Sequence, residues 1–512
     1  GKITAAIAEL IMHKCGQEKK RYVIFCKNKI NTLHGIIGVV RTGGSYIALD
    51  YSLPNQRIAE IIAQLNPAGI VFDTDSKGKL EEIEVEQSIA KISVESAEVK
   101  DKDNVCLSQN VYADDELYCI YTSGTSGKPK GLSVANKGVL RIVNNPNYCR
   151  ITENNIIAQA NNTSFDASVF EIWGAMLNGA TLVLIDKFSL LNPKELRKII
   201  TNEKIDLMIV TTSLFNQLSL MVPIPFEGIK QLMFGGESAN LHCVSEAYRK
   251  LSECRLVNMY GPSESTVFTT FKEISENCIN NKKITIGSPV SDTVVHIRNT
   301  YDGSDLPLGV VGEIIIGGPG VAKGYVANEE ETEKKFHVNC DGERVYCSGD
   351  LAYRDSNGEI VFCGRKDLQV KIRGFRVELS EIKESIDAID LVQDSYVTTV
   401  ENEFGTKQIA AYIKIGEESS KNISIHHIRE CLSQSLPFYM VPAYITFVEK
   451  FNFSSSNKID PSTLPKINFE GNIILPETKT EKMVYQLWQE MLDVETISCD
   501  TSFFEAGGHS LM

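Results

Sequence analysis

The sequence predicts an α/β protein with a large N-terminal part built of several sheets, a small α+β C-terminal part, and then the start of a helical domain. At 512 residues the chain is too long for one hydrophobic core, so about three or four domains are expected. From Lys2 to about Ile200, helical periodicity alternates with short apolar runs, which is typical of largely parallel sheets. From about Ile284 the pattern is richer in short strands, as in Thr293–Arg298 and Val311–Gly317.

The composition and charge describe an ordinary globular protein and exclude some partners. Apolar residues make up 43% of the chain and charged residues 23%, and the formal net charge is −14. A general nucleic-acid binder would show a basic face, so no nucleic-acid partner is expected. No apolar stretch approaches the roughly 20 residues that span a bilayer, and no signal pattern opens the chain. We therefore expect no membrane partner and a cytoplasmic location.

The cysteines and histidines show no metal-ligand or disulfide pattern. The 13 cysteines include no Cys-x-x-Cys pair, and the eight histidines have no ligand spacing, so reduced thiols and structural histidines are expected. The chain opens without a Met, inside a helical pattern, and stops two residues after Ser510. Both ends are therefore expected to have been cut from something longer.

The stretch Tyr121–Gly131 is rich in groups that bind phosphate. It reads Tyr-Thr-Ser-Gly-Thr-Ser-Gly-Lys-Pro-Lys-Gly and follows the apolar run Leu117–Tyr121, which predicts a buried strand. Glycines let backbone N–H groups approach an oxyanion, and hydroxyls and ammonium groups add donors, so the loop suits a polyphosphate. It is not a Walker loop, because Gly124 and Gly127 are too close and Pro129 follows the lysine. Unless the stretch is only a flexible surface loop, the phosphate-binding residues are Thr122, Ser123, Gly124, Thr125, Ser126, Gly127, Lys128 and Lys130.

This loop resembles the phosphate-binding signature of adenylate-forming enzymes, and specifically that of non-ribosomal peptide synthetase adenylation domains. Motifs of those domains occur in order over nearly all of the chain. The resemblance implies an adenylation core that uses ATP and Mg²⁺ and takes an amino acid as substrate. In the reaction it implies, the amino-acid carboxylate attacks the α-phosphorus of ATP and releases pyrophosphate, and a thiol then attacks the acyl-adenylate.

Two glycine turns after apolar strands are expected to wall the nucleotide site. The strands end at Leu232–Glu237 and Asn258–Glu264, and in open α/β sheets ligands lie beyond the carboxyl ends of the strands. Ser263 keeps the hydroxyl of the Thr that is more usual there. By resemblance, Glu264 helps to hold Mg²⁺, and Asp350 binds both ribose hydroxyls, because a carboxylate can accept from both. The adenine- and ribose-binding residues that the family implies are Gly236, Tyr260, Asp350 and Arg365.

A single carboxylate stands among apolar residues at Asp166. A buried Asp is costly unless it is paired, and one explanation is a helix N-cap ahead of Phe170 and Trp173. In the amino-acid-activating members of the family the matching Asp holds the substrate α-ammonium, and we assign that role to Asp166. The pocket positions carried over from the family are Asp166, Ala167, Phe170, Ile209, Met233, Gly235, Met259, Val267 and Phe268, with Lys458 contacting the carboxylate. The set resembles leucine-selecting pockets, so leucine or a similar aliphatic amino acid is expected.

The segment Gly364–Gly374 resembles the hinge of the family, centred on Asp367, between a large core and a small subdomain. The subdomain is expected to contain a helix near Ser380–Ile389 and strands at Asp394–Val400 and Gln408–Ile415. The predicted divisions are the adenylation core at 1–367, the C-terminal subdomain at 368–465, a linker at 466–477 and the N-terminal part of a peptidyl carrier domain at 478–512.

The C-terminal part of the chain contains two residues whose roles the family implies, Lys458 and Ser510, and one predicted start of a helix. Lys458 lies in a Ser-Asn-Lys sequence where Asn-Gly-Lys is usual, and it would be the catalytic residue that stabilises the first transition state. Thr478–Glu481 predicts a capping box ahead of a helix. Ser510 follows Gly-Gly-His, as in carrier domains, and would take the covalent phosphopantetheine arm. The implied partners are a phosphopantetheinyl transferase and the carrier, condensation or thioesterase domains of a larger synthetase.

Two alternative functions stay open at this point. An acyl- or aryl-CoA ligase of the same superfamily would share the fold and the ATP motifs, but its substrate would have no ammonium for Asp166 to bind. The other alternative is a non-catalytic, adenylation-like binding module, and the altered loop before Lys458 is its support. Amino-acid activation is the preferred interpretation, because Asp166 and Ser510 both indicate it.

Overall fold

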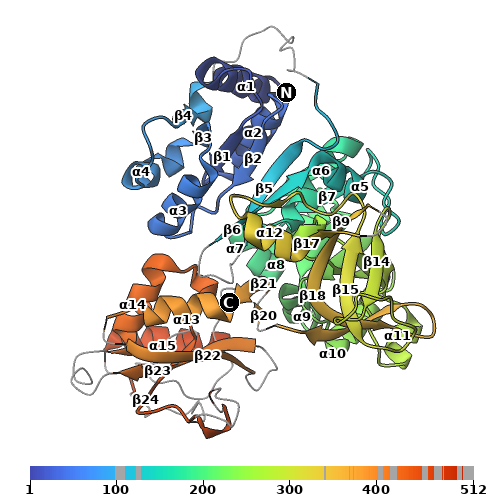
Figure 1. The fold of residues 1–512 in the computed structure, drawn as a ribbon, viewed down its shortest axis with the longest axis vertical. Helices are drawn as coiled ribbons and strands as arrows, with labels where there is room; N and C mark the ends of the chain where they lie inside the picture. Colours follow the sequence, from blue (N-terminus) through green and yellow to red (C-terminus); the bar gives the residue numbers. More distant parts are fainter. Residues whose placement is uncertain are drawn as a thin grey trace. The chain divides into compact units, whose positions relative to one another are not determined.

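The computed structural model describes residues 1–97, 110–122, 129–339, 342–367, 369–372, 374–390, 392–401, 407–415, 424–452, 459, 461–465, 475–476, 478–492 and 499. These residues divide into two compact units (Figure 1). The larger unit is formed by residues 1–122 and 129–374, and the smaller one by residues from 375 onward. The division falls a few residues after Asp367, whose hinge role remains a prediction.

The first sheet of the larger unit has seven strands and is mostly parallel. In spatial order the strands are β16 (Gly324–Tyr325), β6 (Lys130–Ala135), β5 (Glu116–Thr122), β2 (Ser45–Ala48), β1 (Arg21–Phe25), β3 (Gly69–Phe72) and β4 (Ala90–Ser93). β1 pairs in parallel with β2 and β3, whereas β5 and β6 are antiparallel and flank the predicted phosphate loop in the sequence. The strand expected at Leu117–Tyr121 is confirmed as part of β5.

Successive side chains of β1 enter two different hydrophobic clusters, because neighbouring residues of a strand point to opposite faces. The helices of this part, in blue in Figure 1, are α1 (Lys2–Cys15), α2 (Lys29–Arg41), α3 (Asn55–Leu65) and α4 (Thr74–Glu82). Tyr22 and Ile24 share a cluster with residues of α1 and α2. Val23 and Phe25 share the other with residues of α3 and α4. Helices therefore cover both faces of the sheet, as the alternating pattern predicted.

The second sheet also has seven strands and carries most of the predicted substrate positions. In spatial order they are β13 (Ser288–Pro289), β12 (Thr270–Glu273), β11 (Arg255–Tyr260), β10 (Gln231–Gly235), β9 (Leu207–Thr211), β7 (Ile156–Gln159) and β8 (Thr181–Leu184). The strands from β8 to β11 are parallel, and β12 and β13 continue the sheet in antiparallel fashion.

Helices pack on both faces of this second sheet. The helices of this part of the chain are α5 (Asn136–Val143), α6 (Ala167–Asn178), α7 (Lys187–Leu191), α8 (Pro193–Glu203), α9 (Thr212–Ser219), α10 (Leu241–Lys250) and α11 (Glu276–Asn280), of which α6 and α9 pack on the sheet. Met233 of β10 joins the cluster that contains Phe170 of α6. The next residue, Phe234, stacks instead on Phe215 of α9, with ring centroids 4.1 Å apart. The alternation of β10 thus directs one side chain toward α6 and the next toward α9.

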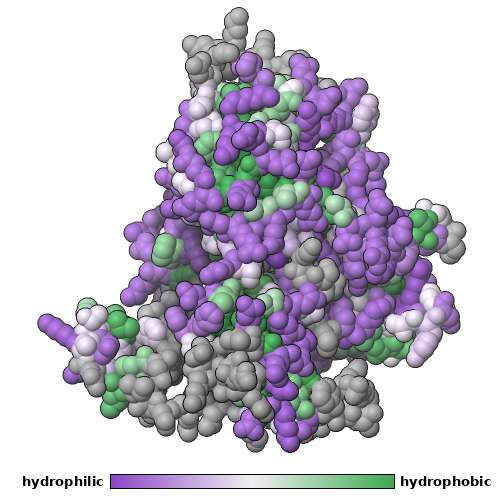
Figure 2. All heavy atoms as spheres, turned by 60° about the vertical axis from the view of Figure 1, so that its left-hand side comes forward, coloured by the Kyte–Doolittle hydropathy of each residue, from purple (hydrophilic) through white to green (hydrophobic). Residues whose placement is uncertain are grey.

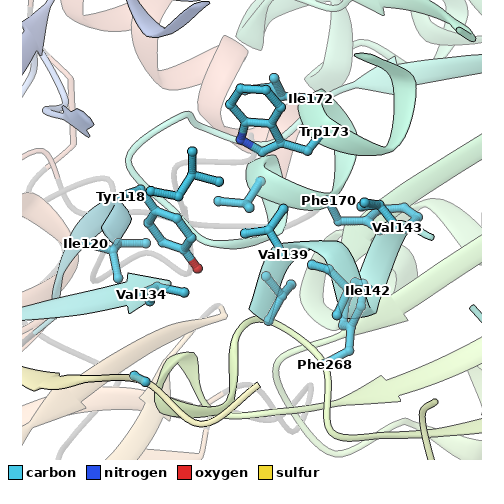
Figure 3. Close-up of a cluster of buried hydrophobic side chains, with 14 of the residues drawn as sticks. Tyr118, Ile120, Val134, Val139, Ile142, Val143, Phe170, Ile172, Trp173 and Phe268 are labelled. Atoms are coloured by element: carbon cyan, nitrogen blue, oxygen red, sulfur yellow. The ribbon is translucent and has the colours of Figure 1, made fainter. Parts of the chain in front are cut away.

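One large hydrophobic cluster joins the sheets of the larger unit. Figure 3 shows part of it, where Tyr118 of β5, Ile142 of α5 and Trp173 of α6 face a common interior. The indole Nε1 of Trp173 also donates to the hydroxyl of Tyr46 in β2, at 3.1 Å. The cluster therefore fixes α6, which begins directly after Asp166, against both major sheets.

The third sheet is antiparallel and brings distant polar residues together. Its strands are β14 (Val294–Arg298), β15 (Gly312–Gly317), β18 (Arg344–Arg354), β17 (Phe336–Val338) and β19 (Ile360–Arg365), with α12 (Glu329–Lys335) before β17. β18 and β19 pair so that Asp350 lies opposite Arg365. β20 (Gln369–Ile372) follows as the last strand of the larger unit. The strands expected at Thr293–Arg298 and Val311–Gly317 are confirmed.

The smaller unit is a compact α+β structure. It contains β21 (Phe375–Glu378), α13 (Leu379–Asp387), β22 (Val392–Glu401), β23 (Lys407–Ile415), α14 (Ile425–Ser435) and β24 (Tyr444–Val448). β22 and β23 are antiparallel, and β23 and β24 are parallel. Lys383 Nζ joins α13 to β22 by donating to Asp394 Oδ1 at 2.8 Å. The helix and the two strands predicted for this region are confirmed, and so is the mixed α/β fold class.

A final helix, α15 (Lys479–Leu492), begins with the predicted capping box. The Glu481 amide donates to the Thr478 hydroxyl at 3.1 Å, and the Thr478 amide donates to the Glu481 carboxylate at 2.9 Å. Both groups satisfy backbone donors that the first helical turn leaves free. This helix is the described portion of the segment that we expected to begin a carrier domain.

The surface is dominated by hydrophilic side chains on the face shown in Figure 2, with hydrophobic residues in small separate patches. Within the described ranges, no helix combines the length and the apolar character needed to cross a membrane. The described cysteines are free thiols, and Cys26, Cys119 and Cys149 are buried.

Candidate active site

The carboxyl ends of β9, β10 and β11 meet at one edge of the second sheet. Gly235 ends β10 beside Met259 of β11, and a Cβ at Gly235 would lie 2.5 Å from the Met259 carbonyl oxygen. Gly236 follows with a φ of 102°, in a conformation that favours glycine. Both glycines predicted for the site therefore have a local structural reason: the close approach of two strand ends at Gly235, and the positive φ at Gly236.

Two side chains from strands of different sheets converge on the carboxylate of Asp350, which is 2% exposed. The Tyr260 hydroxyl donates to Oδ2 at 2.5 Å, and Arg365 Nη1 donates to Oδ1 at 2.6 Å. Tyr260 ends β11, while Asp350 and Arg365 are opposite each other on β18 and β19. The fold thus brings together three of the residues predicted to bind the nucleotide. With Asp367, we call them the carboxylate cluster.

Arg365 also holds Asp367 by a bidentate contact. Its Nε donates to Asp367 Oδ1 at 2.6 Å, and its Nη2 donates to Oδ2 at 2.7 Å. Burial opposes ionisation of this carboxyl, but the hydrogen bonds and charge of Arg365 outweigh it, so the pKa of Asp367 lies below its ordinary value. The predicted hinge residue is therefore an ionised partner of the predicted nucleotide-binding arginine.

The carboxylate cluster keeps its tyrosine protonated. Burial, together with the charge of Asp350, raises the pKa of Tyr260 well above its ordinary value. Lys371 Nζ lies 5.7 Å from the centroid of the Tyr260 ring, so a cation already rests near this aromatic surface. Each carboxylate oxygen of Asp350 has a second lone pair, so the carboxylate can accept further hydroxyl groups without releasing Tyr260 or Arg365.

Asp166 stands at the N-cap position of α6 but does not cap the helix. Its side chain accepts no capping hydrogen bond, and it instead accepts from the Ser263 hydroxyl at 2.5 Å. Burial raises the pKa of Asp166 above its ordinary value, against the opposing bond from Ser263. The N-cap explanation therefore does not account for this carboxylate, which faces the turn after β11.

Glu264 offers one buried carboxylate for a metal ion. It is 1% exposed, its Oε1 accepts from the Tyr325 hydroxyl at 2.7 Å, and its carbonyl accepts from the Ala322 amide. Across the described residues, no three His, Cys, Asp or Glu side chains gather as a metal site. Mg²⁺ is commonly held by one or two carboxylates together with waters and substrate phosphates, so Glu264 fits that ion.

The uncharged substrate positions predicted from sequence lie on neighbouring elements of the same unit. They are Ala167 and Phe170 on α6, Ile209 on β9, Met233 and Gly235 on β10, Met259 on β11, and Val267 and Phe268 after it, and we call them the apolar set. Met233 pairs with Ile209 in the sheet, and the rings of Phe170 and Phe268 meet edge to face at 5.3 Å (Figure 3). Apart from Gly235 and Ala167, these residues belong to one buried cluster, and Ala167 packs against it.

Lys130 is held inside the protein by an acidic partner. Its side chain is 8% exposed, and its Nζ donates to Glu331 at 2.8 Å and lies 5.7 Å from the Tyr325 ring centroid. Lys130 is paired across β5 and β6 with Thr122, the first residue of the predicted phosphate set. Its phosphate contact remains a prediction, and any such contact would share the ammonium with Glu331.

Several predicted residues lie outside the part of the chain that the structure describes. These are Ser123, Gly124, Thr125, Ser126, Gly127 and Lys128 of the phosphate loop, the catalytic candidate Lys458, and the carrier residue Ser510. Their roles remain predictions.

Sequence reasoning missed Glu171, a fully buried carboxylate on α6. It accepts from Asn161 Nδ2 at 2.7 Å and from the Ala160 amide at 3.1 Å. Asn161 Nδ2 also donates to the carbonyl of Ile209, at 3.0 Å, so this network supports one member of the apolar set. Burial raises the pKa of Glu171 to about 7. The signal in the sequence was an acidic residue inside the apolar pattern of a helix.

Arg141 was missed in the same way. It is 4% exposed on α5, among apolar neighbours, and it donates to backbone carbonyls at and after Ser265. A basic residue within an apolar helical stretch was the available signal. Its partners could not be foreseen, because they are far away in the sequence.

Comparisons with known proteins agree with this geometry. The family described as AMP-binding enzyme matches residues 4–326. Bacitracin synthase 1 of Bacillus licheniformis is 37% identical over 495 residues, which cover 95% of this chain and 9% of that protein. Surfactin synthase subunit 1 of Bacillus subtilis (strain 168) is 36% identical over 500 residues, which cover 96% of this chain and 14% of that protein. The chain therefore spans a small part of the length of these relatives.

Solved structures share the fold. Holo-PA1221, an NRPS protein containing adenylation and PCP domains, matches with a TM-score of 0.83 and 25% identity, over 99% of this chain and 84% of that one. O-succinylbenzoate CoA synthetase of Bacillus subtilis matches with a TM-score of 0.77 and 18% identity, over 90% of this chain and 92% of that one, a likeness in fold alone. The resemblance to peptide synthetase adenylation domains is confirmed by these relatives. The chain belongs to the family of AMP-binding enzymes and is an adenylate-forming ligase.

Proposed function

We propose that this chain activates an aliphatic amino acid, with L-leucine as the first candidate, within a non-ribosomal peptide synthetase. The amino acid would react with ATP to give an aminoacyl-adenylate and pyrophosphate. The acyl group would then pass to the phosphopantetheine thiol of a carrier domain. The observation that carries the proposal is the Asp166 carboxylate, which is bound to Ser263 and takes no part in capping its own helix.

An α-ammonium is the partner that best suits Asp166. A carboxylate withdrawn from water is costly unless an opposite charge pairs with it, and burial already raises the pKa of this one. The Ser263 hydroxyl donates to Oδ2, and the carboxylate has further lone pairs with which it would accept from an ammonium. A fatty acid or an aryl acid would bring no positive charge to this position.

The apolar set supports an aliphatic side chain. Met233 and Phe170 are fully buried, and Ile209 and Met259 are nearly so. No charged residue belongs to the set, and flexible methionines suit a branched aliphatic group. Because an apolar site distinguishes one methylene by only about 1–3 kcal/mol, some activation of Ile, Val or Met is expected.

The carboxylate cluster and Glu264 suit the nucleotide. Asp350 would accept the ribose hydroxyls, Tyr260 would stack on adenine, and Glu264 would hold Mg²⁺, which neutralises phosphate charge. In the first step an oxygen of the amino-acid carboxylate forms a bond to the α-phosphorus while the bond to pyrophosphate breaks. Positioning and charge stabilisation dominate such a step, and Lys458 is the residue proposed to stabilise its transition state.

The second half-reaction depends on other domains of a synthetase. The thiol of a phosphopantetheine arm would attack the acyl-adenylate, and AMP would leave. We assign Ser510 as the attachment residue and a phosphopantetheinyl transferase as the enzyme that loads it. Carrier, condensation or thioesterase domains are the proposed partners, and the cytoplasm is the proposed location.

The direct test is ATP–pyrophosphate exchange with each of the 20 standard amino acids. A profile dominated by leucine, with weaker exchange for other aliphatic residues, is expected. A charged or aromatic amino acid activated at least as well as leucine would contradict the assigned side-chain preference. Activity with coenzyme A and a fatty acid, without amino-acid exchange, would favour an acyl-CoA ligase. ATP binding without any exchange would favour a non-catalytic module.

A further inference from the structure

Arg141 is a buried cation with no part in the chemistry proposed above. It lies on α5, and its helix neighbours Val139, Ile142 and Val143 belong to the large hydrophobic cluster (Figure 3). Burying a guanidinium is costly unless hydrogen-bond acceptors surround it. The position therefore requires a specific set of partners.

Backbone carbonyls supply most of the acceptors for Arg141, and none of its hydrogen-bond partners in the described ranges is a carboxylate. Its Nη2 donates to the carbonyl oxygens of Ser265 at 2.7 Å, Thr266 at 3.1 Å and Phe268 at 2.7 Å. Its Nη1 donates to the Thr293 hydroxyl. Burial lowers the pKa of Arg141 to about 10, which leaves the guanidinium charged at neutral pH.

Two of the carbonyls that Arg141 binds, those of Thr266 and Phe268, belong to a strained turn. Thr266 and Val267 have φ angles of 52° and 66°, and a 2.8 Å hydrogen bond from the Phe268 amide to the Thr266 carbonyl closes a three-residue turn around Val267. A γ-turn with a positive central φ is rare and strained, above all at a β-branched residue. Such a conformation persists only where its surroundings determine it. Arg141 binds the carbonyls on both sides of Val267 and so holds the turn.

Two glycines leave room for this arrangement. A Cβ at Gly138 would lie 2.5 Å from Thr266 Oγ1, and a Cβ at Gly320 would lie 2.4 Å from Arg141 Cζ. The Thr266 hydroxyl donates to the Gly320 carbonyl at 2.7 Å. The packing around the guanidinium and the turn is therefore tight, and a side chain at either glycine would clash with it.

The turn sets the place of two members of the apolar set, Val267 and Phe268. The Phe268 ring packs edge to face on Phe170 at 5.3 Å and on Tyr148 at 5.4 Å. Rings at these distances lose contact after small shifts of the backbone, because buried side chains are closely packed. A change in the turn would therefore change the surface that faces the substrate side chain.

We propose that Arg141 is a positioning residue for amino-acid selectivity, which acts by holding the turn around Val267. This inference rests on the proposed function, because it takes Val267 and Phe268 as part of the substrate site. The nucleotide side has its own support, since Asp350 and Arg365 pair directly across β18 and β19. Loss of Arg141 is therefore expected to affect recognition of the amino acid more than recognition of ATP.

The test compares the unchanged chain with Arg141→Lys and Arg141→Met in ATP–pyrophosphate exchange. For the preferred amino acid, KM is expected to rise at least 10-fold in Arg141→Met, and the preference over the next aliphatic amino acid to fall at least 10-fold. The KM for ATP is expected to stay within twofold. Arg141→Lys keeps the charge but loses the fork of donors, so its effects should be intermediate.

Arg354→Lys is the matched control. Arg354 also donates to two backbone carbonyls, those of Val295 at 2.6 Å and Gly358 at 3.2 Å, but it lies in the third sheet. Its substitution is expected to leave the amino-acid preference unchanged. An Arg141→Met protein with unaltered preference and amino-acid KM would overturn the proposal, and so would an equal rise of both KM values.

Thr293→Val keeps the proposal testable if both Arg141 variants fail to fold. It removes the hydroxyl that accepts from Nη1 and leaves the carbonyl contacts in place. A two- to threefold fall in amino-acid preference with an unchanged KM for ATP is expected, and no change would count against the proposal. Failure of the proposed function and failure of the role of Arg141 can be told apart. If the unchanged protein shows no exchange with any amino acid, the proposed function is contradicted. If it shows selective exchange and the substitutions do not alter that selectivity, only the role of Arg141 is contradicted.

Discussion

The carboxylate cluster and the apolar set are both assembled from elements of the larger unit that are far apart in the sequence, yet they are held in opposite ways. In the carboxylate cluster, Arg365 binds two carboxylates directly, and Tyr260 donates to one of them. In the apolar set, the side chains are held by van der Waals packing, as between the rings of Phe170 and Phe268. Polar groups contact the apolar set through its backbone carbonyls. Asn161, which donates to Glu171, also donates to the carbonyl of Ile209.

The difference teaches how each region should respond to change. In the carboxylate cluster, removal of one partner leaves a buried charge without its counterpart, so large and abrupt effects are expected. In the apolar set, neighbours share the packing, so small substitutions should alter preference by degrees. The substitutions below test this contrast.

Asp350→Ala should give the largest effect. It removes the acceptor of Tyr260 and Arg365 and the proposed acceptor of the ribose hydroxyls, and loss of one partner from a buried pair costs about 3–5 kcal/mol. A fall of at least about 100-fold in kcat/KM for ATP is expected in pyrophosphate exchange. Asp302→Ala is the control, because that carboxylate is exposed and accepts from neighbouring Ser304. An unchanged kcat/KM for ATP in Asp350→Ala would contradict the expectation that the carboxylate cluster responds abruptly to loss of one partner.

Glu171→Gln should remove a pH dependence of stability. The folded pKa of Glu171 is about 7, above the ordinary 4.5, so the folded state binds more protons than the unfolded state between these values. The contribution of this group is present at low pH and is lost as the pH rises through about 7, by roughly 3 kcal/mol in total. The free energy of unfolding of the unchanged protein should therefore fall more steeply from pH 5 to pH 8 than that of the variant.

Chemical unfolding followed by tryptophan fluorescence measures this difference, because Trp173 is buried on the same helix as Glu171. Glu253→Gln, at an exposed position, should keep the slope of the unchanged protein. Parallel slopes for Glu171→Gln and the unchanged protein would show that the carboxylate is ionised throughout this range.

Asp166→Asn tests the one charge within the apolar region. A hydrogen bond to a charged group contributes about 1.5–3 kcal/mol, so the KM for the amino acid should rise by about 10- to 100-fold. The affinity for ATP should stay unchanged. Asp186→Asn is the matched control, because Asp186 does cap its helix, accepting from the Ser189 amide at 3.0 Å. An equal loss of ATP affinity in Asp166→Asn would mean that Asp166 serves the nucleotide instead.

Ile209→Val should give the smallest effect. It deletes one buried methyl group beside Met233, a change that commonly costs about 0.5–1.5 kcal/mol. The preference among leucine, isoleucine and valine should shift by about two- to tenfold in competing exchange assays. Ile70→Val, at a fully buried position in β3 of the first sheet, should leave that preference as it was. A loss of all activity in Ile209→Val would contradict the expectation that the apolar set responds to substitution by degrees.

Most of the fold could be predicted because it depends on local patterns. Short apolar runs predicted strands such as β5 and β15, and Thr478 with Glu481 predicted the start of α15. The glycine turn at Gly235 was visible as well, although its physical reason, contact with the Met259 carbonyl, was not. These features follow from burial and backbone geometry within a few residues.

The site was predictable as a set of residues and much less so as a set of contacts. The Tyr260, Asp350 and Arg365 positions came from their motifs, and the structure brings them together. The partner of Asp166 was not predicted, although Ser263 itself was noted for its hydroxyl. Lys130 was assigned to phosphate alone, and its ion pair with Glu331 was not foreseen.

The sequence by itself determined the fold class, the order of the elements and the residue types available for chemistry, because periodicity and turn residues act locally. Only the tertiary structure decided which carbonyls Arg141 binds, which amide Glu171 holds and which hydroxyl meets Asp166. The reason is that a buried polar group needs hydrogen-bond partners, and these partners come from segments far away in the sequence. The residues next to the group in the chain therefore do not show which partners the fold brings to it.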